Sequence, residues 1–118
     1  MRYLLLIYGD ESKFGNMSEA EAEADLQRWW EYDAAIKEAG ASPGGAALQP
    51  TSTATSVRDQ NGSPLVTDGP FAETREQLAG YYILDVENLD QAIEWAHRCP
   101  WADGGTIELR PIQEFDQG

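Results

Sequence analysis

The amino-acid sequence predicts an α+β domain in which two helices pack on one face of an antiparallel sheet. Two apolar runs of strand length, two segments with helical spacing of apolar residues, and the alternation of these segments along the chain lead to this prediction. The chain has 118 residues, and a chain of that size buries roughly two-thirds of its unfolded surface. We therefore expect a single domain over residues 1–118.

The first predicted elements are a strand and a long helix. Arg2–Tyr8 reads RYLLLIY, a continuous apolar run that is typical of a strand covered on both faces. Ser18 followed by Glu21 fits a capping box, and apolar residues then recur at helical spacing. These patterns predict a strand over Arg2–Tyr8 and an amphipathic helix over Ser18–Ala39.

The middle of the chain predicts short strands and a hairpin. Ala46–Gln49 is a short strand candidate, and the β-branched residues of Thr53–Arg58 favour an extended chain. The Asn-Gly pair within Asp59–Pro64 is a strong reversal signal. We expect Thr53–Arg58 and Leu65–Thr67 to be the arms of a hairpin connected through Asp59–Pro64.

The last predicted elements repeat the order strand, helix, strand. Gly80–Val86 reads GYYILDV and is a second apolar strand, Asn88 with Gln91 begins a helix that ends before Pro100, and Thr106–Pro111 alternates as a final strand. The tail 113–118 is expected to fray. The complete order matches the split βαβ, ferredoxin-like plan.

The two apolar strands also predict a partner. Two helices cover only one face of a sheet, yet both strands are apolar at odd and even positions, so a second copy is the simplest cover for the other face. We expect a homodimer with facing sheets. Glu108 and Arg110 would then point into the inter-sheet space, where a buried Arg indicates either a structural ion pair or an anion-binding pocket. Tyr8 and Tyr82 are expected to present hydroxyls to the same space.

Composition excludes several classes of function. The formal charge of −13 repels nucleic-acid phosphates and anionic lipid, so neither nucleic acid nor membrane is expected as a partner. One Cys and one His allow no internal disulfide and make a zinc or haem site improbable. With no signal-peptide pattern and no long apolar stretch, a cytoplasmic protein without metal or cofactor is expected.

Candidate chemistry is concentrated between Thr67 and Glu76. Asp68 and Glu73 are the candidate acid–base pair, and Arg75 or Arg110 would hold an anionic substrate. In this segment Gly69 permits unusual backbone angles and Phe71 is expected to anchor the turn in the core. The alternative is structural: Asp68 caps the turn, while Glu73 and Arg75 form an exposed pair of little energetic consequence.

A family resemblance covers nearly the whole chain, from the first apolar strand to Pro111. It rests on the run DGPFAETREQLAGYYILDVENLDQAIEWAHRCP, with LQPTSTATSVR before it and IELRPI after it. These segments resemble the YCII-related family and, more narrowly, its DGPF-domain (DGPFAETKE) subgroup. The resemblance implies a ferredoxin-like fold, a dimeric α/β barrel and a bacterial origin, and it implies no particular reaction.

The resemblance also implies roles for individual residues. Asp68 stands at the family's acidic pocket position, and Arg75 stands where the motif commonly has Lys, which keeps the charge and alters the geometry. Members of the wider family have a His and an Asp facing a pocket, whereas the single histidine here, His97, matches no such position. DGPF-domain proteins tend to be encoded beside extracytoplasmic-function sigma factors, which implies a regulatory link.

Two functions follow from these observations. The first is a cytoplasmic homodimer that binds, or transforms by acid–base chemistry, a small polar or anionic metabolite near Asp68 and Arg110. The second is a non-catalytic regulatory or interaction protein in an extracytoplasmic-function sigma-factor pathway. The sequence does not decide whether the chain is an enzyme.

Overall fold

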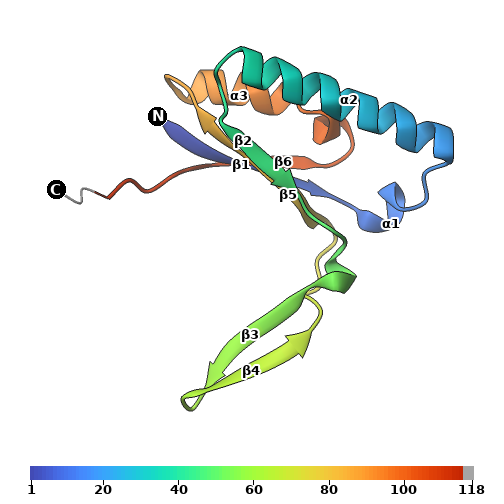
Figure 1. Cartoon of the computed structure of the whole chain (residues 1–118), viewed down its shortest axis with the longest axis vertical. Coiled ribbons are helices and arrows are strands. Elements are labelled where there is room, and N and C mark those ends of the chain that lie inside the picture. The colour runs from blue at the N-terminus through green and yellow to red at the C-terminus, as the bar shows by residue number, and fades with distance from the viewer. Residues whose placement is uncertain (116–118) are drawn as a thin grey trace.

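The computed structural model describes residues 1–115 and consists of a sheet with helices on one side and a separate hairpin (Figure 1). The elements in chain order are β1 (Arg2–Gly9), α1 (Glu11–Phe14), α2 (Glu19–Glu38), β2 (Gly44–Ala47), the 3₁₀ turn η1 (Thr51–Thr53), β3 (Thr55–Gln60), β4 (Ser63–Asp68), β5 (Gln77–Asp85), α3 (Leu89–Arg98), the 3₁₀ turn η2 (Pro100–Asp103) and β6 (Thr106–Pro111). Among these described residues, no helix has both the length and the apolar character needed to cross a membrane.

The central sheet has the strand order β2-β5-β1-β6, and every neighbouring pair is antiparallel. Strands β1 and β2 are therefore parallel to each other with β5 between them, and α2 is the connection from one to the other. Figure 1 shows α2 and α3 on the same side of this sheet. The predicted α+β class is confirmed, with helices on one face of an antiparallel sheet.

Local capping signals fix the starts of the two long helices. The Ser18 hydroxyl accepts from the Glu21 amide at 3.1 Å, and the Glu21 carboxylate accepts from the Ser18 amide at 3.3 Å, which completes the predicted capping box. The Asn88 side chain accepts from the Gln91 amide at 2.9 Å at the start of α3. Because capping depends only on residues close together in the chain, the sequence predicted both helix starts.

The core lies between the sheet and the two long helices. Alternate residues of β1 point toward the helices, and Leu5 is fully buried between Tyr82 of β5 and Leu109 of β6, its partners in register. The same layer contains Leu84 and Ile36, which are also fully buried. This layer is completed within one chain.

The opposite side of the sheet, which we call the open face, has no covering layer in the chain. It includes Leu4, Leu6, Tyr81 and Ile83, which are only half-buried although three of them are aliphatic and all lie on the two central strands. Glu108 and Arg110 of β6 lie opposite Leu6 and Leu4 and are exposed on the same face, as the alternation predicted. The open face is thus apolar at its centre and charged along β6.

Strands β3 and β4 form a hairpin, which we call the arm (Thr55–Asp68), that projects away from the sheet and helices (Figure 1). The hairpin was predicted, but its connection is shorter than Asp59–Pro64. The strands continue to Gln60 and Ser63, and Asn61 and Gly62 alone make the turn with φ values of 54° and 89°, which suit a primed two-residue turn.

The arm buries little within its own chain. Val57 and Val66 are paired across its two strands and remain 63% and 60% exposed. The radius of gyration is 16.5 Å, against about 13–14 Å for a compact domain of this length. A two-stranded hairpin alone is only marginally stable in water, and the apolar surface of the arm lacks the packing that stabilises the central sheet.

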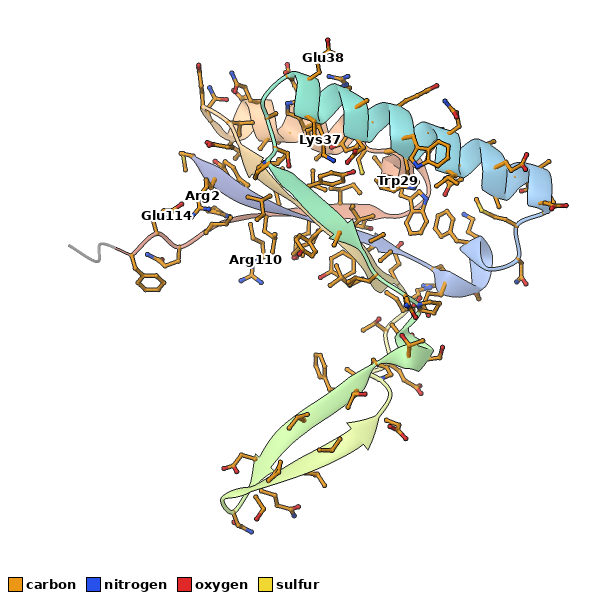
Figure 2. All side chains as sticks on the ribbon, viewed as in Figure 1. Arg2, Trp29, Lys37, Glu38, Arg110 and Glu114 are labelled. Carbon is orange, nitrogen blue, oxygen red and sulfur yellow. The ribbon has the colours of Figure 1, made fainter. Side chains whose placement is uncertain are left out.

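The two ends of the described chain meet at one edge of the body. The Ile112 amide donates to the Arg2 carbonyl at 2.9 Å, and the Arg2 guanidinium donates twice to the Glu114 carboxylate, at 2.7 and 2.9 Å (Figure 2). This pairing lowers the pKa of Glu114 and raises that of Arg2. Fraying of 113–118 stays a prediction: the structure describes this tail only as far as Phe115, and residues 116–118 lie outside the described part of the chain.

Candidate functional site

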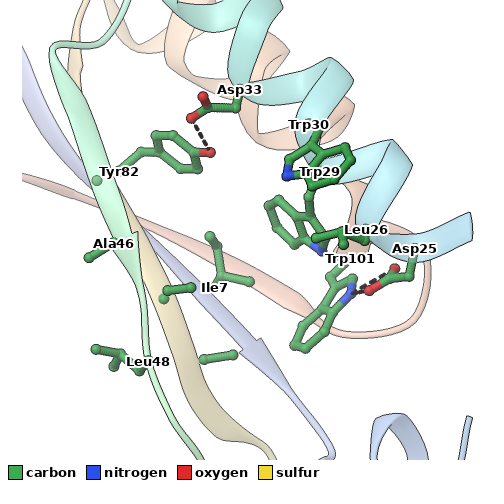
Figure 3. Close-up of a pocket in the computed structure, with 14 residues that line it drawn as sticks. Ile7, Asp25, Leu26, Trp29, Trp30, Asp33, Ala46, Leu48, Tyr82 and Trp101 are labelled. Carbon is green, nitrogen blue, oxygen red and sulfur yellow. Dashed lines mark hydrogen bonds between the residues drawn. The ribbon is translucent and has the colours of Figure 1, made fainter. Parts of the chain in front are cut away.

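A cavity of about 450 Å³ lies between α2 and the sheet (Figure 3). Its volume falls within the range of about 300–1,000 Å³ that is usual for small-molecule sites. The lining residues come from β1, α2, the β2 segment, β5 and η2: Ile7, Asp25, Leu26, Trp29, Trp30, Asp33, Gly45, Ala46, Ala47, Leu48, Ala79, Gly80, Tyr82 and Trp101. Leu26, Trp30 and Leu48 are exposed and lie where the cavity meets solvent.

Helix α2 supplies one wall because its lining residues recur at helical spacing. Asp25, Trp29 and Asp33 are four residues apart and follow one face of the helix, with Leu26 and Trp30 beside them. Figure 3 shows Trp29 and Asp33 directed from the helix toward the sheet, while Trp30 lies on the exposed side of the helix. The same face therefore carries the large Trp29 ring and two carboxylates.

The opposite wall is built from small residues of β2 and β5. Ala47 pairs with Gly80, so these two positions of the sheet face the cavity with almost no side-chain bulk, next to Ile7, which also pairs with Gly80. A Cβ atom at Gly80 would lie 2.8 Å from the Ala46 carbonyl oxygen, closer than real Cβ atoms approach such an atom. Gly80 thus allows β2 to lie close to β5 and leaves space below α2.

A continuous series of aromatic contacts connects three rings that line the cavity, Trp29, Tyr82 and Trp101, with two rings outside the lining, Phe14 and Tyr32. Phe14 of α1 stacks on Trp101 of η2 with centroids 3.9 Å apart and planes 6° apart. Trp101 meets Trp29 edge-on at 5.8 Å, and Trp29 in turn meets Tyr32 at 6.1 Å. Tyr32 then contacts Tyr82 at 5.6 Å. Edge-on contacts are among the favourable arrangements for aromatic rings, and together with the Phe14–Trp101 stack they hold the lining rings in place.

Each carboxylate of the cavity accepts a hydrogen bond from an aromatic side chain. The Trp101 indole donates to both oxygens of Asp25, at 3.1 and 3.2 Å, and the Tyr82 hydroxyl donates to Asp33 Oδ1 at 2.9 Å (Figure 3). Lys37 pairs with Asp33 Oδ2 at 2.9 Å. The orientation of both carboxylates is therefore fixed by partners on other elements or on the next turn.

The pKa values of the groups around Asp33 follow from these contacts. The Lys37 hydrogen bond is the largest cause that lowers the pKa of the Asp33 carboxyl below its usual range; burial opposes it, and the Tyr82 hydrogen bond lowers the pKa further. Burial raises the pKa of Tyr82, and its hydrogen bond to Asp33 raises it further. At neutral pH the pair is an ionised carboxylate that accepts from a neutral phenol.

Cys99 lies behind this region and is buried. Burial raises the pKa of its thiol to about 12. The thiol therefore remains protonated at neutral pH and is a poor nucleophile, because the thiolate is the reactive form. Within residues 1–115, no three His, Cys, Asp or Glu side chains are grouped so that they could hold a metal ion.

The structure places the predicted acid–base residues outside this cavity. Asp68 is the last residue of β4, and Glu73 and Arg75 follow in the exposed segment between the arm and β5. The Asp68 carboxylate accepts no hydrogen bond from any side chain or amide of residues 1–115, so the predicted turn-capping contact is absent there. Likewise, the described residues contain no ion pair between Glu73 and Arg75.

The Asp-Gly-Pro-Phe run is a turn at the foot of the arm. Gly69 has φ of 97°, a value that favours glycine, and its amide donates to the Ala54 carbonyl at 2.6 Å while its own carbonyl accepts from Ser56 at 2.8 Å. The prediction that Phe71 anchors this turn in the core is wrong, since its side chain is 80% exposed. The turn is held by one backbone hydrogen bond and by the Ser56 hydroxyl, and Phe71 is left uncovered.

The predicted position of Tyr82 is also wrong. Its side chain lies on the helix side of the sheet, in contact with Asp33, and not in the inter-sheet space. The run GYYILDV is apolar at every position before its aspartate, so no alternation showed which residues face the helices. Tyr81 is the one that lies on the open face, opposite Leu6.

Tyr8 and Arg110 do lie on the open face, as predicted. Tyr8 pairs with Leu78 and Thr106, and Arg110 pairs with Leu4. Figure 2 shows Arg110 pointing away from the helices. No carboxylate of residues 1–115 forms an ion pair with Arg110. The structure therefore leaves this guanidinium on an apolar face without a partner in the described chain.

Sequence reasoning missed the cavity itself. Asp33 falls near the apolar side of the predicted helix over Ser18–Ala39, and the four tryptophans are of a residue type that is common in cores and interfaces. The missing information was that η2 brings Trp101 to α2. Arg28 of α2 also donates to the Pro100 carbonyl, although these two residues are 72 positions apart in the chain. A local pattern cannot report such a meeting of distant segments.

A small α+β domain with an aromatic cavity between helix and sheet is thus the class that fold and site define. A family model described as the YCII-related domain matches residues 1–116. An uncharacterised protein of Rhizobium meliloti (strain 1021) is 37% identical over 120 aligned positions, which cover 100% of this chain and 97% of that protein. The chain belongs to the YCII-related domain family.

Proposed function

We propose that the chain is a small-molecule-binding protein whose ligand occupies the cavity between α2 and the sheet. The observation that carries this proposal is the cavity itself, with its volume of about 450 Å³ and its largely apolar and aromatic lining. A few oriented polar groups, including Asp25, Asp33 and Tyr82, supply specificity. The ligand-binding role predicted for Tyr82 is kept, in a different cavity from the one expected.

A neutral apolar dye tests the proposal directly. N-phenyl-1-naphthylamine fluoresces when it is buried, and we expect it to bind with one molecule per chain. Ala47 lines the cavity beside Gly80, so Ala47→Phe fills the space and is expected to weaken binding about tenfold or more, equivalent to about 1.4 kcal/mol. The matched control, Ala34→Phe, adds the same ring on an exposed position of α2.

Two results would count against this function. If Ala47→Phe and the native chain bind the dye equally, the dye lies elsewhere, and the open face and the arm are the obvious alternatives. If the Ala34→Phe control loses binding as well, the effect is general destabilisation. A urea unfolding curve of each variant separates this second case from a true loss of the site.

We further propose that the protein is a homodimer of the ferredoxin-like, dimeric α/β barrel type, with open faces in contact. The strand order β2-β5-β1-β6, with β5 antiparallel between β1 and β2, supports the ferredoxin-like assignment. The half-buried apolar centre of the open face and the uncovered apolar residues of the arm support the dimer. Sedimentation of the purified chain at several concentrations measures the assembly.

Arg110 favours a second candidate site within that dimer. Covering the open face would remove water from a guanidinium that has no carboxylate partner among residues 1–115, and such a group needs an anion. A small anionic ligand held by Arg110, with Tyr8 beside it and Asp68, Glu73 or Arg75 contributed from the foot of an arm, fits this need. Malonate and inorganic phosphate are suitable probes.

Thermal unfolding of the native chain and of Arg110→Gln with each probe tests this second site. We expect the anions to raise the melting temperature of the native protein and to leave Arg110→Gln unchanged. Equal shifts in both proteins, or no shift in either, would contradict an anion site at Arg110. A glutamate of the partner would then be the remaining candidate for pairing with the guanidinium.

A further inference from the structure

We propose that the cavity between α2 and the sheet binds an organic cation, in which an ammonium group is attached to a compact apolar or aromatic body. This inference rests on the proposed function, because it names the ligand class of the same cavity. The prediction from sequence was an anionic or polar ligand at a different place. The charges, the rings and the hydrogen bonds of the cavity each support a cation here.

The charged residues that line the cavity are all acidic. Asp25 and Asp33 are the two, and the lining contains no Lys, Arg or His. Their counter-ions, Arg28 and Lys37, are outside the lining and half exposed, and Arg28 approaches Asp25 only to 3.9 Å. Exposed pairs of this kind are weak. The side chain of Asp25 is only 15% exposed, so water screens its charge poorly.

Aromatic rings provide the second feature that a cation recognises. Three of the four tryptophans line the cavity, Trp29, Trp30 and Trp101, together with Tyr82. The face of an indole is the best of the natural π surfaces for an ammonium group, and the attraction increases when the contact excludes water. Rings from α2, β5 and η2 surround the carboxylates in Figure 3.

Hydrogen bonding supports the same class of ligand. The Trp101 indole and the Tyr82 hydroxyl already donate to Asp25 and Asp33, so these donors are occupied and orient the carboxylates. An ionised carboxylate has about four acceptor positions and no donor. The unused positions accept from an ammonium group, whereas an anion would meet two negative charges inside the cavity and a net charge of −13 outside it.

Three probes of nearly equal shape separate charge from apolar fit. They are 2-phenylethylammonium, 2-phenylethanol and 3-phenylpropionate, and tryptophan fluorescence reports their binding because three indoles line the cavity. At pH 7 we expect the ammonium to bind about tenfold or more tightly than the alcohol. The carboxylate is expected to bind most weakly of the three.

Asp33→Asn and Asp25→Asn test which groups carry the preference. Each variant retains the shape of the side chain and an oxygen that accepts from Tyr82 or Trp101. We expect each to reduce the preference for the ammonium over the alcohol about threefold or more, and to leave the affinity for the alcohol unchanged. Asp59→Asn removes the same charge from the exposed arm and is the matched control.

The outcomes separate this inference from the proposed function. Equal binding of ammonium and alcohol, with competition against N-phenyl-1-naphthylamine, overturns the cation class and leaves small-molecule binding in the cavity intact. An equal loss of the ammonium preference in Asp59→Asn also overturns the cation class, because the preference would then come from the net charge of the protein and not from the carboxylates of the cavity. Failure of all three probes and of the dye overturns both proposals.

Discussion

The two faces of the central sheet are made from the same strands but differ in how completely the chain covers them. On the helix side, Leu5 and Leu84 are fully buried. On the open face their neighbours Leu4 and Ile83 remain half exposed and meet no second layer of the same chain. Apolar residues on both sides of a strand thus make two different surfaces: one is covered within the chain, and the other, we propose, contacts a second copy.

The largest expected effect is on the helix side. Leu5→Ala removes a fully buried side chain and should lower the free energy of unfolding by about 2–5 kcal/mol. Leu4→Ala, one position along on the open face, should cost at most about 1 kcal/mol in the dissociated chain, because less of its side chain is buried there. Urea unfolding of dilute protein measures both, and equal losses would remove the distinction between the faces.

The next largest effect is on assembly. In the proposed dimer, Leu4→Lys places an unpaired charge in the interface twice, once from each copy. We expect dimer dissociation to become about 100-fold more favourable, equivalent to about 2.8 kcal/mol, while the monomer stays folded. Sedimentation equilibrium measures the change, with Ala34→Lys on the exposed side of α2 as control. An unaltered dimer in Leu4→Lys would show that the open face is not the interface.

A smaller effect is expected where β2 completes the cavity. Gly80→Ala introduces a Cβ 2.8 Å from the Ala46 carbonyl oxygen, which forces β2 away from β5 and costs about 1–3 kcal/mol. Dye binding in the cavity should weaken as well. Gly104→Ala is the control, because its Cβ would lie 3.7 Å from Phe14 in ordinary contact. Normal stability and dye binding in Gly80→Ala would contradict the role given to the close strand approach.

The smallest expected effect is the pH dependence of Asp33. Contacts with Lys37 and Tyr82 hold its folded-state pKa below the unfolded value, so its contribution is present above the unfolded pKa of about 3.9 and is lost as the pH falls through the folded pKa. The side chain is 37% exposed, which limits the contribution to a few tenths of a kcal/mol.

Comparison of Asp33→Asn with the native chain checks this sign. The native protein should be slightly more stable at pH 7, and the difference should disappear as the pH falls from about 4 toward 2. Thermal unfolding across that pH range provides the measurement. A difference that grows in acid would mean that the carboxyl is destabilised, and not stabilised, by its surroundings.

The sequence predicted the parts of the fold that depend on neighbouring residues. Ser18 with Glu21 and Asn88 with Gln91 marked the two helix starts, and strict alternation placed Thr106–Pro111 with its correct faces. The family resemblance is shown at the level of the YCII-related domain. Short α1 was missed because four residues give no helical periodicity.

The site was less predictable because it depends on distant segments and on the absence of side chains. Trp101 meets Trp29 only after η2 turns the chain back to α2, and Gly80 contributes by leaving space. The sequence contains these residues, but it does not show that Gly80 and Trp101 line the same cavity. The Asp-Gly-Pro-Phe run was easy to notice because its residues are consecutive in the sequence. In the structure it lies at the foot of the exposed arm and outside the cavity.

The meeting of Arg2 with Ile112 and Glu114 has a consequence for chain connectivity. Since the two described ends are adjacent, a short linker could join them, and new ends could be opened between Asn61 and Gly62 at the tip of the arm. Such a circular permutant would keep every strand of the central sheet in place and convert the arm into two independent tails. It would separate, in one molecule, the proposed binding of a ligand in the cavity from the proposed contribution of the arm to the dimer.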